Sequence, residues 1–160
     1  SEMCIRDRSL IGKDPKSVCV KSTCILQKKI ADSATIHLEF ETGLKSHISV
    51  SWLNPYKEQK LVVVGRSAML VFDDTKPWCE KLALHSYKVD NSNGSPILKK
   101  SNEEFIKVIE KEPLRSECQH FVNVVEENLE PLTNGAEGLK VLKVLSAVSE
   151  AQEKNEVLKF

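Results

Sequence analysis

The hydrophobic period of this sequence changes once along the chain, and that change limits the folds it can adopt. Residues 33–41 and 44–52 alternate apolar and polar side chains, a period typical of strands with one buried face. The short loop between them contains Gly43 and predicts an antiparallel hairpin. From Pro113 onward, apolar residues recur at three-and-four spacing, which indicates helices. Strands followed by helices predict an α+β fold, in which an antiparallel-dominated open sheet carries helices on one face.

The other elements follow from the same patterns. Further strands are predicted at four places: 17–29, 60–64, 68–72 and 80–89. The polar residues 90–111 are expected to form a loop with room for one edge strand. Helices are predicted at about 113–128 and about 135–154, the second starting with Asn134 as N-cap. The apolar stripe of the second helix is expected to consist of Leu139, Leu142, Leu145 and Val148, supported by Val141, Val144 and Ala151.

The runs 61–64 and 68–72 are apolar at consecutive positions, so both faces of their strands should be covered. Helices at the end of the chain can cover only one face. The second face is therefore expected to be covered by a missing domain or by another copy of the chain. The alternative is that residues 90–111 fold back over it.

Composition excludes several classes of partner. Lys plus Arg and Asp plus Glu each number 23, and this zero net charge argues against nucleic acid or an anionic membrane as the main partner. The longest wholly apolar run, 68–72, is far shorter than the ~20 residues of a membrane span. The five cysteines form no C-x-x-C pair and indicate reduced thiols in a cytoplasmic protein.

The six glycines exclude the common nucleotide-binding loops. They form neither a G-x-G-x-x-G turn nor a phosphate loop ending in Gly-Lys-Ser/Thr. No cofactor-binding residue is therefore expected in this chain.

The first eight residues differ from the rest of the sequence. They read SEMCIRDR and resemble the translation of an adapter used to prepare sequencing libraries. In that interpretation residues 1–8 are a non-native scar and the reading frame was cut there. The alternative is an ordinary disordered N-terminus.

The most site-like stretch is 51–57. It places Trp52, Asn54, Tyr56 and Lys57 at the end of a strand, where aromatic and hydrogen-bonding groups could line a sugar or another ring-shaped ligand. The alternative is a packed tryptophan followed by an ordinary loop.

Other polar groups give weaker evidence for a functional site. His37 and His47 lie on the polar faces of neighbouring strands and could form half a metal site, but the spacing suggests no third ligand, so no metal is expected. The pair Asp73 and Asp74 could bind a cation or act as acid and base, or could form a solvated turn. No catalytic residue is predicted from these patterns.

Two segments resemble one family. Residues 31–74, from ADSATIHLEF to VVVGRSAMLVFDD, resemble the core hairpins of the C-terminal domain of Gfo/Idh/MocA oxidoreductases. Residues 112–151, from EPLRSECQHF to VLSAVSEA, resemble the closing helices of that domain. Within that family, the sequences of these two segments are most similar to the nucleotide-sugar branch. This branch includes NAD-dependent dehydrogenases that oxidise the 3-position of a UDP-N-acetylhexosamine uronate.

The resemblance implies a divided enzyme. In the family, an N-terminal Rossmann domain binds NAD or NADP and carries the catalytic Lys in a Glu-Lys-Pro motif, which this sequence lacks. Residues 9–160 would be the substrate-binding and oligomerisation domain, inactive and without cofactor on its own. The domain would pack its sheet face against a second copy in a homo-oligomer. The alternative is a stand-alone, non-enzymatic binding or scaffold module with the same fold.

The resemblance also suggests contacts to a sugar or nucleotide-sugar substrate. We expect these contacts to come from Trp52, Asn54, Tyr56, Lys57 and Arg115. Alternatively, Arg115 could pair with Glu112 or Glu117 near the start of its helix.

Overall fold

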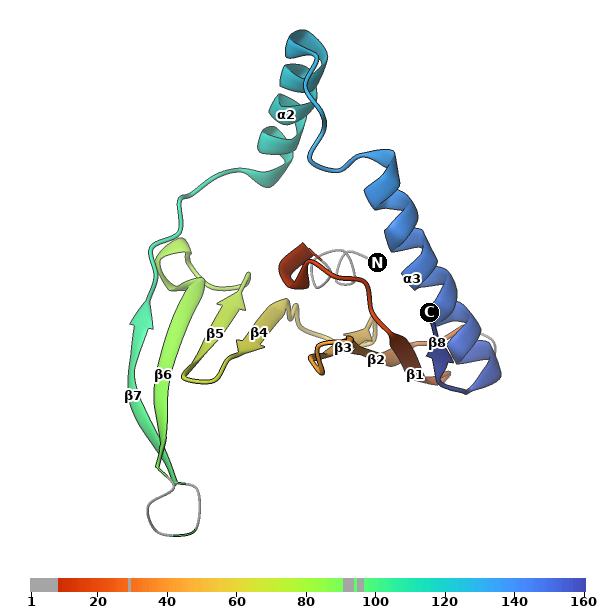
Figure 1. The fold of residues 1–160 in the computed structure, drawn as a ribbon, viewed down its shortest axis with the longest axis horizontal. Coiled ribbons are helices and arrows are strands. Elements are labelled where there is room, and N and C mark those ends of the chain that lie inside the picture. Colours follow the sequence, from red (N-terminus) through yellow and green to blue (C-terminus); the bar gives the residue numbers. More distant parts are fainter. Residues whose placement is uncertain (1–8, 29, 91–93, 95–96) are drawn as a thin grey trace. The chain divides into compact units, whose positions relative to one another are not determined.

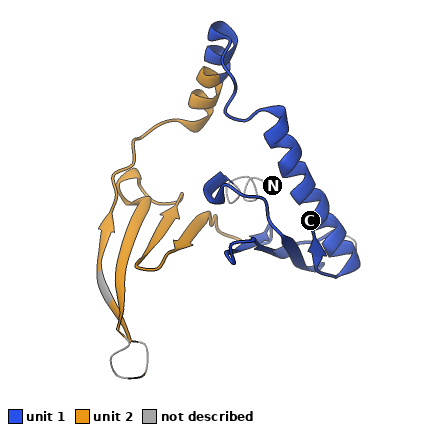
Figure 2. Cartoon of the chain, in the orientation of Figure 1, with its two compact units in different colours: residues 1–53, 121–160 blue, residues 54–120 orange. Residues whose placement is uncertain are grey.

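The computed structural model describes residues 9–28, 30–90, 94 and 97–160 (Figure 1). The eight residues that resemble an adapter lie outside this part. The chain divides into two compact units, one formed by residues 1–53 and 121–160 and the other by residues 54–120 (Figure 2). Its described strands are β1 Ser17–Thr23, β2 Ser33–Glu39, β3 Lys45–Ser51, β4 Lys60–Val64, β5 Ala68–Asp73, β6 Leu82–Asp90, β7 Ile97–Phe105 and β8 Leu158–Lys159. The α-helices are α2 Pro113–Glu127 and α3 Gly135–Lys154, and a 3-10 turn spans Trp78–Glu80.

The described strands form two antiparallel sheets, ordered β3-β2-β1-β8 and β4-β5-β6-β7. The predicted α+β class with antiparallel pairing is therefore confirmed, and the strands are divided between two sheets. The break follows β3, where Asn54-Pro55 interrupts the ladder because proline has no N–H to donate.

The first unit buries the apolar face that the alternation predicts. Val20, Ile36 and Ile48 lie side by side across β1, β2 and β3, and α3 packs on this face of the sheet (Figure 1). The core consists of Val18, Val20, Ile36, Leu38, Phe40, Ile48, Val144 and Ala151. Burial of these side chains is the main favourable contribution to the stability of this unit.

The buried face of α3 differs from the predicted one. Val144 is 4% exposed, whereas Leu142 is 62% exposed and Leu139 is also mostly exposed. Two positions along an α-helix correspond to a rotation of about 200°, so Leu142 lies on the side of α3 away from Val144. The smaller side chains Val144 and Ala151 face the sheet, and Leu145 and Val148 are partly buried beside them.

The predicted start of α3 is confirmed. The side chain of Asn134 accepts a hydrogen bond from the backbone N–H of Glu137 at 3.0 Å, which satisfies one of the free donors of the first turn. The helix ends at Asn155, which adopts a left-handed conformation with φ of 52°.

β1 ends earlier than the predicted range 17–29. The carboxylate of Asp32 accepts hydrogen bonds from the backbone N–H groups of Ile25 and Leu26, at 2.5 and 2.8 Å. These bonds hold the chain in a turn, so the residues after Thr23 do not continue the strand. Asp32 itself is buried.

The second unit matches the predicted hairpin at β4 and β5 and extends it. The strand predicted at 80–89 is present as β6, which pairs with β5, and β7 is a nine-residue edge strand in the region 90–111, where a loop with room for one edge strand was expected. The apolar side chains of this unit are half-buried in β5 and mostly exposed in β4. Among its described strand residues Ala83 alone is buried, and Val64 is 70% exposed. The cover expected for the central apolar strands is thus not supplied by the strands of this unit.

α2 covers the range predicted for it but buries none of its side chains. Its apolar residues Leu114, Phe121 and Val125 are mostly exposed. In the part of the chain that the structure describes, no helix is long and apolar enough to cross a membrane.

Replacing Asn134 with alanine should lower the free energy of unfolding by about 1 kcal/mol, because the N–H of Glu137 loses its capping acceptor. Urea denaturation followed by the helical circular dichroism signal measures this change. Asn134→Ser keeps a capping acceptor without placing a second negative charge beside Glu130, which accepts a hydrogen bond from Asn134 Nδ2 at 2.9 Å, and should lose less stability. Equal loss in both variants would show that the cap does not contribute.

Candidate functional site

The five predicted substrate contacts are all exposed. Trp52 and Tyr56 are 61% and 65% exposed, so Trp52 is not a packed core residue. Asn54, Tyr56 and Lys57 lie on the segment between β3 and β4, and Arg115 lies in the first turn of α2. Within the described residues, no hydrogen bond or ion pair joins these five side chains to one another. The structure therefore leaves their predicted role untested.

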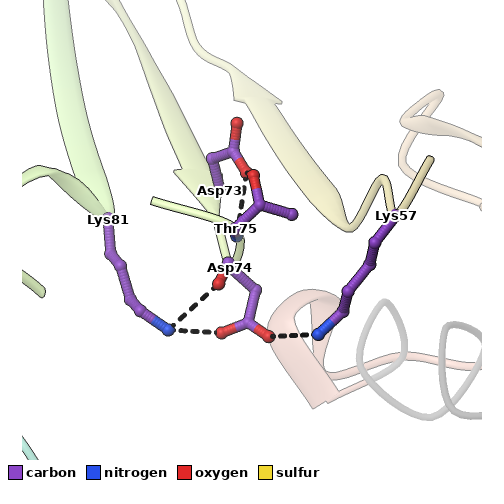
Figure 3. A network of polar contacts seen from close by, with 5 residues as sticks. All are labelled: Lys57, Asp73, Asp74, Thr75 and Lys81. Carbon is purple, nitrogen blue, oxygen red and sulfur yellow. Dashed lines mark hydrogen bonds and ion pairs between the residues drawn. The ribbon is translucent and has the colours of Figure 1, made fainter. Parts of the chain in front are cut away.

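Lys57 takes part in a polar network at the turn after β5 (Figure 3). Asp74 accepts a hydrogen bond from Lys81 Nζ at 2.6 Å, and Lys57 Nζ lies 3.9 Å from its other carboxylate oxygen. Asp73 accepts hydrogen bonds from the backbone N–H and the hydroxyl of Thr75, at 3.1 and 2.6 Å. The two carboxylates thus point away from a common centre and each has its own donors.

This network sets the charge state of the turn. The hydrogen bond from Lys81 is the largest cause of the lowered pKa of Asp74, and the hydrogen bonds from Thr75 are the largest cause of the lowered pKa of Asp73. Both side chains are therefore carboxylates at neutral pH. A general acid needs a raised pKa, so the lowered pKa of both side chains argues against that one role for Asp73 and Asp74.

A separate hollow lies on one face of the second sheet. Its volume is about 390 Å³. Pairing places Val71, Ala83 and Phe105 in one row across β5, β6 and β7, and these side chains form its apolar part. The polar side chains around this row are Lys60, Asp73, Lys76, Glu80, His85 and Glu103.

The polar lining of this hollow contains both hydrogen-bond donors and hydrogen-bond acceptors. His85 Nε2 lies 3.5 Å from a carboxylate oxygen of Glu103, its partner in the β6–β7 pairing. Lys60 Nζ lies 3.5 Å from Asp73. Ammonium donors and carboxylate acceptors around an apolar floor suit a polyhydroxylated ligand, which carries many donors and acceptors.

The sequence pattern gives only part of the signal for this hollow. Ala83 and His85 share a face by their period of two, and this signal was available. Glu103 and Phe105 come from β7, whose polar sequence gives no clear alternation, so their position beside β6 could not be read from the pattern.

The described residues offer no complete cage of protein ligands for a metal ion. In the described ranges, no group of three or more His, Cys, Asp or Glu side chains could hold a metal ion. His37 and His47, predicted to be neighbours, do lie together on the first sheet.

Comparison with known proteins supports the resemblance found in the sequence. Residues 8–71 match the profile of the GFO/IDH/MocA C-terminal domain. No match is found among curated proteins. Solved oxidoreductase structures share the fold over nearly the whole chain, which confirms the predicted architecture.

Three of these structures illustrate the likeness. UDP-N-acetylglucosamine 3-dehydrogenase GnnA from Acidithiobacillus ferrooxidans is 17% identical with a TM-score of 0.76, covering 96% of this chain and 45% of that one. An aldose-aldose oxidoreductase from Caulobacter crescentus, complexed with glycerol, is 18% identical with a TM-score of 0.71, covering 98% and 44%. The WlbA dehydrogenase from Bordetella pertussis, in complex with NADH and UDP-GlcNAcA, is 17% identical with a TM-score of 0.68, covering 99% and 42%. The chain thus spans less than half the length of these proteins.

The charge of Asp74 should stabilise the second unit only above the carboxyl pKa. Because that pKa is lowered in the folded protein, the contribution is complete at neutral pH and disappears as the pH falls below about 4. Asp74→Asn should therefore be less stable than the original chain at pH 7, by less than about 1 kcal/mol for a partly exposed pair. Urea denaturation at a series of pH values measures the difference in unfolding free energy between the two chains. A difference that stays constant down to pH 3 would contradict a stabilising role for the Asp74 charge.

Proposed function

We propose that this chain, which carries the fold of a GFO/IDH/MocA C-terminal domain, is the substrate-binding and oligomerisation half of an NAD(P)-dependent oxidoreductase acting on a sugar or nucleotide sugar. The observation that carries the proposal is the combined match of the family profile and of the fold to dehydrogenases, two of which are named with a UDP-sugar. Because the chain spans 45% of the length of GnnA, the proposal requires a second half in the intact protein.

The cofactor would be bound by that other half. A dinucleotide site of the common kind needs a parallel strand, a glycine-rich turn and a helix in succession. In the described residues both sheets are antiparallel, and the sequence has no G-x-G-x-x-G run. We therefore place NAD(P) in the other half and assign this chain no step of hydride transfer.

Lys57 is the residue of this chain best suited to bind an anionic group of the substrate. Its side chain is 72% exposed, and its distance of 3.9 Å from Asp74 makes a weak ion pair. Asp74 is neutralised mainly by Lys81, which leaves the Lys57 ammonium available for a phosphate or a carboxylate. Tyr56 and Asn54, on the same segment, supply an aromatic face and an amide for a sugar ring. Trp52 and Arg115 stay within the proposal as further contacts.

The exposed apolar strands support the oligomerisation part of the proposal. β4 exposes Val62, Val63 and Val64, side chains that a stable surface in water rarely displays together. A second copy of the chain would remove them from water. The same strands would explain why this unit lacks a buried core of its own.

The reading frame upstream of residue 9 tests the proposal directly. We expect it to encode a Rossmann half, and we expect the complete protein to reduce NAD or NADP with a UDP-N-acetylhexosamine uronate as substrate. Lys57→Gln in that protein should raise KM for the nucleotide sugar by about tenfold, which corresponds to one lost charge-assisted contact, with little change in kcat. Lys99→Gln serves as the matched control, because Lys99 is also exposed and is paired with Asp90.

Two results would contradict the proposal. A native start codon with its ribosome-binding site at this point of the gene would favour the stand-alone module. Micromolar binding of NAD by residues 9–160 alone, measured by isothermal titration, would show that the cofactor site had been placed in the wrong half.

A further inference from the structure

Two histidines meet on the outer face of the first sheet. His37 of β2 and His47 of β3 are direct partners in the strand pairing. Their Nδ1 atoms lie 2.6 Å apart, and their rings are 4.7 Å apart at an angle of 84°. Ile36, Leu38 and Ile48 alternate with them and fill the opposite face, which α3 covers. The two imidazoles are thus held at one point of the surface by a packed core behind them.

The short distance between the two nitrogens restricts their protons. At 2.6 Å one Nδ1 donates a hydrogen bond and the other accepts it, so the accepting lone pair points at its neighbour. If both rings carry their proton on Nε2 instead, two lone pairs point at the same place. That arrangement is unfavourable unless a cation lies between them.

We propose that His37 and His47 form a two-histidine site for a first-row transition-metal ion, with Cu²⁺ preferred over Ni²⁺ and Zn²⁺. Imidazole nitrogen is a good ligand for all three ions, and the general order of affinity places Cu²⁺ first. With metal–nitrogen bonds of about 2.0 Å, two neighbouring ligands of a square-planar ion lie about 2.8 Å apart. The observed separation of 2.6 Å is close to this distance.

The site would be open rather than closed. In the described part of the chain no third His, Cys, Asp or Glu is placed to share an ion with the pair. Cys19 of β1 is the direct cross-strand partner of His37. It does not form a set of three metal ligands with the two histidines. Water or a donor from a small molecule would fill the other positions, so the ion would exchange readily.

A bound ion would replace the hydrogen bond between the two histidines with two coordinate bonds and so strengthen the link between β2 and β3. Because it binds the folded sheet and not the separated histidines, it would raise the melting temperature of the chain. This inference rests on the first sheet and is independent of the proposed function.

Titration of the chain with Cu²⁺ and with Ni²⁺ tests the site. We expect each ion to raise the melting temperature, and we expect the electron paramagnetic resonance spectrum of the Cu²⁺ form to show coupling to two imidazole nitrogens. His37→Gln and His47→Gln should each weaken Cu²⁺ binding by more than about tenfold, since even loss of a supporting group at a metal site costs that much. The controls are His85→Gln and Cys19→Ser, which should bind as the original chain does.

Other outcomes would overturn the proposal. Unchanged affinity in both His37→Gln and His47→Gln would place the ion elsewhere. If either variant fails to fold, the spectrum of the unmodified chain decides, and coupling to one nitrogen or to none would contradict the site.

Discussion

The structure of the first unit depends on covering one face of a small antiparallel sheet. Alternation in β1, β2 and β3 places their apolar side chains on the same face, and this face is unfavourable in water until a helix packs on it. α3 does so with Val144 and Ala151, which bring the end of the chain back to β1. The contact from Lys21 to Asn155 joins residues 134 positions apart. The geometry of the outer face, including the histidine pair, follows from this core.

The second unit presents the opposite situation. Two of its strands, β4 and β5, are apolar at consecutive positions, yet β4 is largely exposed and β5 is only half-buried. Its polar residues gather instead at the turn of Asp73 and Asp74 and around the hollow at His85. A surface of this composition suits a unit that completes its burial through binding, which is why the proposed function assigns it both the substrate contacts and the association of subunits.

Elements with a clear periodicity of apolar residues could be predicted from the sequence. Features that depend on tertiary contacts could not. The hairpin of β2 and β3, α2, and the N-cap of α3 at Asn134 are confirmed, because alternation, helical spacing and capping are local signals. The end of β1 depends on the carboxylate of Asp32, six residues or more away from the N–H groups it binds. The predicted apolar stripe of α3 is correct at Leu145 and Val148 and wrong at Leu139 and Leu142, because the periodicity does not show which of several adjacent apolar rows packs on the sheet. The neighbouring positions of His37 and His47 could be predicted from the pairing of the two hairpin strands. The hollow could not be predicted, because part of its lining comes from β7, whose position the sequence pattern does not give.

Hydrogen exchange of the backbone amides tests the central claim, that the first unit is closed by its own core and the second needs a partner. In the isolated chain, the amides of β1 and β2 should exchange slowly and those of β4 and β5 much faster, since protection follows burial and packing. In the intact protein, β4 and β5 should become protected while β1 and β2 change little. Equal and strong protection of both sheets in a monomeric isolated chain would contradict the account.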